Sequence, residues 1–274
     1  MNKRIEISQQ TETEVQQVIH SFWDYQYGYS RSAETREAGD SGQDYLSFLE
    51  EEGSLLFVIC DGVSMSYFGD FAAKFLGDHL IDWLININED DQSEETLQQI
   101  LNQYLKEIAV RATESLKGHQ IPPHIKGMLR EVLAAKKEHG SGAIYGCGRI
   151  DLPSKKFPEG RILLAWQGDV RLRLWTDHTE WTTKLGDRFY THHQWNSTCG
   201  PVGGMPHVFC ETLRDWGSQG SILLYSDGLK ALNNLERISG KQLQLTLTKE
   251  GQNPSSDDMS VFHVRWDTSL FKTH

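Results

Sequence analysis

Three apolar stretches of the sequence each end in an aspartate beside a glycine. The stretches LLFVIC, RILLAWQ and SILLYS lead into Asp61–Gly62, Gly168–Asp169 and Asp227–Gly228. A fourth acidic pair, Asp257–Asp258, precedes the apolar residues that start at Met259. A single Asp–Gly pair is most often a turn, because Asp tolerates positive φ and Gly favours it. The repetition instead indicates strands that bring several carboxylates to one place.

Carboxylates that meet in this way need a counter-charge. Two of them about 4 Å apart repel by about 4 kcal/mol at an effective dielectric constant near 20. A divalent cation removes that repulsion, and oxygen ligands without His or Cys favour Mg²⁺ or Mn²⁺ over zinc. Three shared carboxylates and two such cations leave a charge of about +1, which attracts a phosphate group and acidifies a bound water. The residues alone therefore predict a metal-assisted phosphoester hydrolase.

Hydrophobic periodicity predicts the elements that position these residues. Short apolar or alternating runs predict strands at 22–29, 55–60, 143–150, 162–166, 170–175, 207–212, 222–225 and 261–266. Helical spacing predicts helices over 68–84 and 93–112, with Ser93 as the N-cap of the second, and a third helix that opens at Pro122–Pro123. Loops are expected at 32–42 and 196–206. Helices between two groups of strands indicate an α+β fold of stacked sheets covered by helices.

Composition narrows the class of protein. The chain has 274 residues, with 27 Lys and Arg against 38 Asp and Glu, a formal net charge of −11. This acidic balance argues against binding to nucleic acid or to an anionic membrane surface. With no linker visible, we expect a single domain over 21–274, preceded by an N-terminal extension or edge strand at 1–20.

Targeting signals and cysteine usage indicate the compartment. No apolar run approaches the roughly 20 residues of a spanning helix, and the polar sequence after Met1–Arg4 lacks the pattern of a signal peptide. The four cysteines are scattered without metal-site or redox spacing. The expected location is a reducing cytoplasm.

An ordered set of short motifs resembles the metal-dependent type-2C protein phosphatases, the PPM family, in their bacterial-like form. DGVSMSYFGDFAA at 61–73 resembles the family pattern DGxGGxxxGxxA[AS]. The other motifs that match are GQD ending at Asp44 (N[EQ]D), GSGA at 140–143 (GSTA), GDVR at 168–171 (GDSR), SDG at 226–228 and DDMS at 257–260 (D[DN]xT). Each motif is short, but together they follow the family's order and cover most of residues 40–265.

The resemblance implies an αββα sandwich of two antiparallel β-sheets flanked by helices, with two or three Mn²⁺ or Mg²⁺ ions in a cleft at one end. It implies that Asp61 bridges two metals, that Gly62 contributes its carbonyl, and that Asp227 and Asp257 hold the first metal. Asp44 is expected at the rim, acting through bound water. Asp169, with Asp227, matches the third-metal site of bacterial members. A metal-bridging hydroxide would attack phosphorus, so no side chain is the expected nucleophile.

The sequence departs from the family pattern at several positions. Ser64 and Met65 replace paired glycines beside the metals, and Val63 stands where some eukaryotic members have a histidine. The nearest candidate for the phosphate-binding arginine is Arg36, eight residues before Asp44. Further departures are Ala231, in place of a third-metal aspartate of some members, and an additional helix at 122–138, expected to pack on the surface or dock a partner.

The expected activity is hydrolysis of phosphoserine and phosphothreonine in proteins, and the partner implied is a phosphorylated protein such as the target of a cognate kinase. The residues themselves support only phosphoester hydrolysis, so a small phosphoester is a second substrate class. A different class of function is a catalytically silent phosphatase-like module that binds a phosphoprotein or partner. Ser64, Met65 and the displaced arginine favour the silent module, whereas the retained aspartates favour the enzyme.

Overall fold

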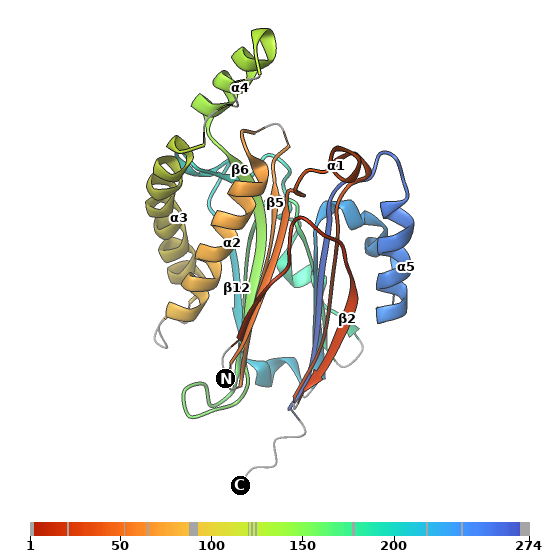
Figure 1. The fold of residues 1–274 in the computed structure, drawn as a ribbon. Coiled ribbons are helices and arrows are strands. Elements are labelled where there is room, and N and C mark those ends of the chain that lie inside the picture. Colours follow the sequence, from red (N-terminus) through yellow and green to blue (C-terminus); the bar gives the residue numbers. More distant parts are fainter. Residues whose placement is uncertain are drawn as a thin grey trace.

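The computed structural model describes residues 3–20, 22–51, 53–64, 66–87, 93–119, 121, 123, 125–176, 179–217, 219–236 and 238–268. Met65 and Pro122, named above, lie outside these ranges. Two sheets stand face to face, with α2 (Gly69–Asn86) and α3 (Glu94–Lys117) outside one and α5 (Gly240–Gly251) outside the other (Figure 1). This is the α+β, four-layer αββα arrangement that the sequence predicted.

Antiparallel pairing joins the strands in both sheets. The first sheet comprises β1 (Lys3–Glu6), β4 (Asp44–Glu51), β5 (Ser54–Gly62), β6 (Gly142–Asp151), β7 (Arg161–Gln167), β10 (Gln194–Asn196), β11 (Gly200–Val202) and β12 (His207–Glu211). The second comprises β2 (Thr13–His20), β3 (Trp23–Ser30), β8 (Arg171–Thr176), β9 (Thr179–Glu180), β13 (Gln219–Tyr225) and β14 (Met259–Asp267). The first 20 residues therefore supply an edge strand to each sheet, β1 on β4 and β2 on β3.

Strand β5 shows why its sequence is apolar without alternation. Leu55, Phe57 and Ile59 face the core between the sheets, while the residues between them face the core under α2 and α3. A strand that is buried on both faces needs apolar side chains on both. Phe57 stacks on Phe262 of β14 with ring centroids 5.0 Å apart, which joins the two sheets at this point.

The helices follow the sequence signals in part. Ser93 caps α3 as expected, because its hydroxyl accepts a hydrogen bond from the Thr96 backbone at 3.1 Å. The third helix, α4, begins at Gly127 and ends at His139, so it opens later than the proline pair. Residues 32–42 contain the short helix α1 (Ala33–Ala38), and residues 196–206 contain part of the β10–β11 hairpin. Both segments were expected to be loops.

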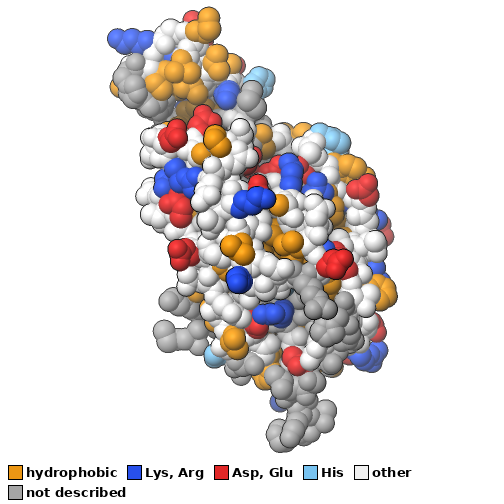
Figure 2. All heavy atoms as spheres, turned by 90° about the vertical axis from the view of Figure 1, so that its right-hand side faces the viewer, with side chains coloured by type: hydrophobic (Ala, Val, Ile, Leu, Met, Phe, Trp, Pro, Cys, Tyr) orange, Lys and Arg blue, Asp and Glu red, His pale blue; other side chains and the backbone are white. Residues whose placement is uncertain are grey.

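Helix α4 projects from the body of the molecule beyond α3 (Figure 1). It has no buried residue, and the side chains of Met128 and Leu129 are 80% and 57% exposed. Hydrophobic side chains gather on this projecting part (Figure 2). None of the described helices is long and apolar enough to cross a membrane. The remaining helical elements are the 3-10 helices η1 (Thr182–Leu185), η2 (Leu213–Trp216) and η3 (Asp227–Asn234).

Candidate active site

The first sheet places two of the candidate aspartates directly opposite each other. Asp44 begins β4 and Asp61 lies near the end of β5, and the two residues are register partners. Directly opposed residues of an antiparallel pair have their side chains on the same face, and like charges in that position are destabilising. The next residue of β5, Gly62, pairs with Ala143 at the start of β6. The Asp–Gly and GSGA motifs thus meet at one end of this sheet.

The second sheet brings the other motifs to one of its ends. Tyr225, the last residue of β13, pairs with Arg171 at the start of β8 and with Val261 near the start of β14. Asp227 follows β13 by two residues, and Asp169 precedes β8 by two. Asp257 lies two residues before the first residue of β14. Three carboxylates that are distant in sequence therefore lie beside the same end of the second sheet.

Electrostatic interactions connect the carboxylates of the two sheets. Burial raises the pKa of Asp61 well above its usual value, and the carboxylates of Asp44 and Asp227 add to this shift. Asp257 and Asp169 contribute in the same direction. Burial and the charge of Asp227 also raise the pKa of Asp169. All five aspartates predicted from the sequence to be metal ligands therefore share one environment.

Asp44 is the most isolated of these carboxylates. Its side chain is 0% exposed, and neither of its carboxylate oxygens has a hydrogen-bond partner of good geometry among the residues that the structure describes. Burial and the neighbouring Asp258 raise its pKa well above the usual range, and the hydroxyls of Ser226 and Ser260 oppose this rise only in part. An ionised carboxylate without partners in the interior is strongly unfavourable, and an oxygen-rich, negatively charged environment of this kind suits Mg²⁺ or Mn²⁺. The residues present therefore fit a divalent cation.

The carboxylates do not form a closed ligand set as they stand. Among the residues that the structure describes, no three His, Cys, Asp or Glu side chains are grouped closely enough to hold a metal ion. The aspartates thus interact electrostatically, but their side chains are not arranged as a complete set of metal ligands. Binding of a cation by several of them requires their side chains to move inward.

Asp258 has a structural role that the sequence reasoning did not assign. Its Oδ1 accepts a hydrogen bond from the Ser32 backbone at 2.6 Å, and its Oδ2 accepts one from the backbone of Gln43. Gln43 directly precedes Asp44, so the second aspartate of DDMS holds the start of β4 in place. The first aspartate, Asp257, is left as the candidate ligand.

Two of the motif glycines are required by close backbone contacts. A Cβ atom on Gly62 would lie 2.3 Å from the carbonyl oxygen of Gly69, the first residue of α2. A Cβ atom on Gly228 would lie 2.3 Å from the carbonyl oxygen of Asp258. Asp61–Gly62 lies within β5 and is not a turn, so these glycines allow strand ends and helices to meet at the site.

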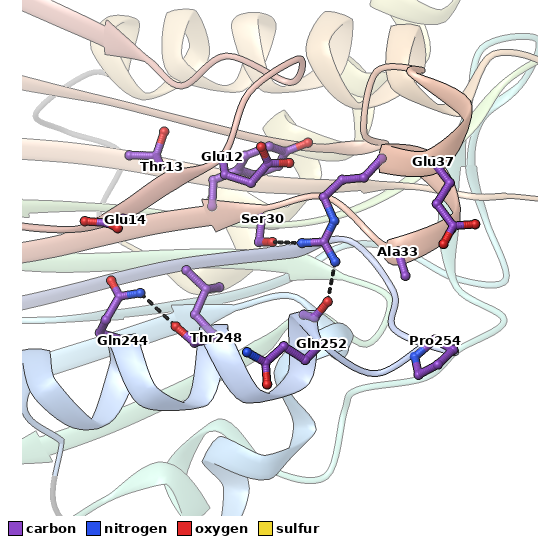
Figure 3. Close-up of a pocket in the computed structure, with 14 residues that line it drawn as sticks. Glu12, Thr13, Glu14, Ser30, Ala33, Glu37, Gln244, Thr248, Gln252 and Pro254 are labelled. Atoms are coloured by element: carbon purple, nitrogen blue, oxygen red, sulfur yellow. Dashed lines mark hydrogen bonds between the residues drawn. The ribbon is translucent and has the colours of Figure 1, made fainter.

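The side chain of Arg36 binds the C-terminal end of α5 and not the candidate metal site. Its Nη2 donates to the carbonyl of Gly251, the last residue of α5, and its Nη1 donates to Ser30 Oγ at 3.4 Å. It lines a pocket of about 500 Å³ between α1, β3 and α5 (Figure 3), together with Glu12 and Glu37. This geometry gives the phosphate-binding role no support, because the guanidinium satisfies an unpaired carbonyl at a helix C-terminus.

We expect Arg36→Ala to lower the free energy of unfolding by about 1 kcal/mol, the usual net contribution of such hydrogen bonds. The KM for an aryl phosphate is expected to stay unchanged. Urea denaturation and steady-state kinetics measure the two effects. Arg214→Ala, which removes a 69% exposed arginine from an ion pair with Glu159, is the control and should alter neither quantity. A several-fold rise in KM for Arg36→Ala would restore the phosphate role.

Two cations near the carboxylates were missed by the sequence reasoning. Lys230 Nζ lies 2.7 Å from Asp227 Oδ2, and this hydrogen bond raises the pKa of Lys230. Arg171 opposes the rise in the pKa of Asp169. The three-residue spacing of Asp227 and Lys230 is visible in the sequence, but only the helical turn of η3 makes it an ion pair.

Comparison with known proteins rests on structure, because no family model and no curated protein sequence matches the chain. The phosphatase Stp1 from Staphylococcus aureus matches with a TM-score of 0.56 and 16% identity, over 90% of this chain and 96% of that one. A serine-threonine phosphatase 2C from Toxoplasma gondii matches with a TM-score of 0.56 and 12% identity, over 97% and 99%.

RsbX, solved in complex with magnesium, matches with a TM-score of 0.55 and 10% identity, over 92% of this chain and 100% of that one. Identities this low establish the fold alone. Together with the two-sheet topology described above, these matches show that the chain has the fold of the PPM-type serine/threonine phosphatases.

Proposed function

We propose that the protein is a Mn²⁺- or Mg²⁺-dependent phosphatase that hydrolyses phosphoserine and phosphothreonine in proteins. The observation that carries the proposal is that strand pairing in the two sheets brings five carboxylates close enough to interact electrostatically, namely those of Asp44, Asp61, Asp169, Asp227 and Asp257. The fold shared with serine/threonine phosphatases supports the substrate class. A phosphorylated protein, such as the target of a cognate kinase, is accordingly the proposed partner, and the cytoplasm the proposed location.

The proposed ligands divide the work between the two sheets. Asp61 and the carbonyl of Gly62 lie at the end of β5, and Asp227 and Asp257 lie at the end of the second sheet. A cation shared by them would supply an activated water at neutral pH and positive charge opposite the phosphoryl oxygens. The chain's own contribution is to place these residues beside strand ends, from which their side chains can turn toward a common cation.

Asp44 would act through a bound water and not as a direct ligand of the cation. It faces Asp61 across the β4–β5 pair, and Asp258 fixes the backbone beside it through Gln43. In that position its carboxylate can accept a hydrogen bond from a water at the site and orient it. No side chain of this group is proposed as the nucleophile.

The test is turnover of a chromogenic aryl phosphate by the purified chain. We expect hydrolysis with Mn²⁺, loss of activity on chelation and recovery when Mn²⁺ is restored. A phosphothreonine peptide should then be a better substrate than small phosphoesters. The absence of turnover with either Mn²⁺ or Mg²⁺, combined with binding of the phosphopeptide, would instead support the silent binding module, for which Ser64 and the position of Arg36 are the sequence arguments.

A further inference from the structure

Asp169 and Asp227, which the motif comparison assigns to a third cation, already face positive charges of the chain itself. Lys230 Nζ binds Asp227 Oδ2 at 2.7 Å. The charge of Asp169 also favours the protonated form of Lys230, although the ion pair itself is with Asp227. The Lys230 side chain is 60% exposed and the Asp227 side chain is 22% exposed, which places the ion pair at the open side of the site.

A second cation stands beside the same pair. Arg171 follows Asp169 by two residues at the start of β8, and it interacts electrostatically with both Asp169 and Lys230. Its Nε is buried and has no hydrogen-bond partner within the described ranges of the chain. Lys230 and Arg171 thus offset part of the negative charge of Asp169 and Asp227, whereas the main electrostatic influences on Asp61 are all carboxylates. Carboxylates whose charge is partly offset in this way attract a divalent ion less strongly than those around Asp61.

The local sequence adds no carboxylate to offset these cations. Residue 231, next to the lysine and within η3, is an alanine. Asp227 keeps its second oxygen, Oδ1, free of the lysine contact. Asp227 can therefore offer Oδ1 to a cation at Asp61, while Oδ2 is occupied on the side of Lys230.

We propose that Lys230 is a built-in counter-ion that takes the place of a third metal ion, so that this chain binds divalent cations at the Asp61 centre and none between Asp169 and Asp227. The inference rests on the proposed function, since it assumes that Asp61 and Asp227 bind metal. It deepens that function by fixing the number of ions and by naming a lysine as the residue that sets it.

The experiment counts bound Mn²⁺ on the full chain by calorimetric titration, with free Mn²⁺ followed by electron paramagnetic resonance. The wild-type chain should bind two ions. Lys230→Ala should bind one more, or bind its weakest ion at least roughly tenfold more tightly, because a positive charge next to the carboxylates is gone. Lys230→Arg, which keeps the charge, should behave like the wild type.

Two further variants test whether the number of bound Mn²⁺ ions depends on Lys230 and Asp169 specifically. Lys249→Ala removes the same charge from the exposed surface of α5 and should leave the count and the affinities unchanged. Asp169→Asn combined with Lys230→Ala should lose the additional ion. Because the readout is bound Mn²⁺ and not turnover, it does not depend on catalytic competence.

Different results would overturn different claims. A third ion on the wild-type chain, or an unchanged count and affinity in Lys230→Ala, would contradict the role of Lys230 and leave the phosphatase proposal in place. The absence of any Mn²⁺ binding that depends on Asp61 would contradict both.

Discussion

Replacing Asp61 with asparagine is expected to lower kcat/KM for an aryl phosphate by at least about a thousandfold, the scale seen when a central group of a catalytic site is removed. Asp61 is the carboxylate that interacts with all four other candidate ligands. The change keeps the size of the side chain and removes its charge, so a cation loses its shared ligand. Steady-state kinetics with Mn²⁺ measures the loss.

The same variant should fold, because neutralising a carboxylate among carboxylates relieves repulsion. Thermal unfolding without metal should give a melting temperature at least equal to that of the wild type. Mn²⁺ should raise the melting temperature of the wild type and leave that of Asp61→Asn nearly unchanged. Asp82→Asn, an exposed change on α2, is the matched control. Wild-type activity in Asp61→Asn would remove the proposed centre.

Replacing Asp44 with asparagine is expected to raise the free energy of unfolding of the metal-free protein by about 1–3 kcal/mol at pH 8. Both Asp44 oxygens are buried without a well-aligned hydrogen-bond partner in the described part of the chain. Burial raises the pKa of this carboxyl well above its usual value, more than the hydroxyls of Ser226 and Ser260 lower it. A carboxyl whose pKa is higher in the folded state holds its proton more tightly there. Wild-type stability therefore falls as the pH rises from about 4, the unfolded value, towards the raised one.

Asparagine does not titrate. The difference in unfolding free energy between Asp44→Asn and the wild type should therefore grow as the pH rises through that range, and it should not change with pH below the range. Urea denaturation at several pH values, with EDTA present, measures the difference. Asp187→Asn, an exposed change after η1, should show no such trend. A variant that is less stable than the wild type at pH 8 would mean that Asp44 has a stabilising partner in the folded protein.

The sequence was most informative where a residue's surroundings follow from its own element. The run from Leu55 to Cys60 predicted a strand buried on both faces, and β5 confirms it. The repeated Asp–Gly endings predicted that carboxylates meet, with divalent cations to offset their repulsion. The opposition of Asp44 and Asp61 follows from the register of β4 on β5, which the short connection between Glu51 and Ser54 sets. Because no strand was predicted at 44–51, the sequence did not place these two residues opposite each other.

Arg36 shows where spacing along the chain fails. Its distance from Asp44 was counted as if the intervening residues formed a loop. Instead Ser32 caps the short helix α1, and the helix directs Arg36 to the end of α5. The sequence of α1 is AETREA, whose lack of apolar periodicity hides the helix. Ser32 with Thr35 was the available signal, because the Ser32 hydroxyl accepts from the Thr35 backbone at 3.0 Å.

Anomalous diffraction from crystals grown with Mn²⁺ tests the gathering of carboxylates by cations most directly. We expect Mn²⁺ peaks between the two sheets, within roughly 2.0–2.4 Å of oxygens of Asp61, Asp227 and Asp257. These side chains should have moved inward relative to the metal-free protein. Fully soaked crystals with no peak beside Asp61, or with Mn²⁺ bound only elsewhere on the chain, would contradict it.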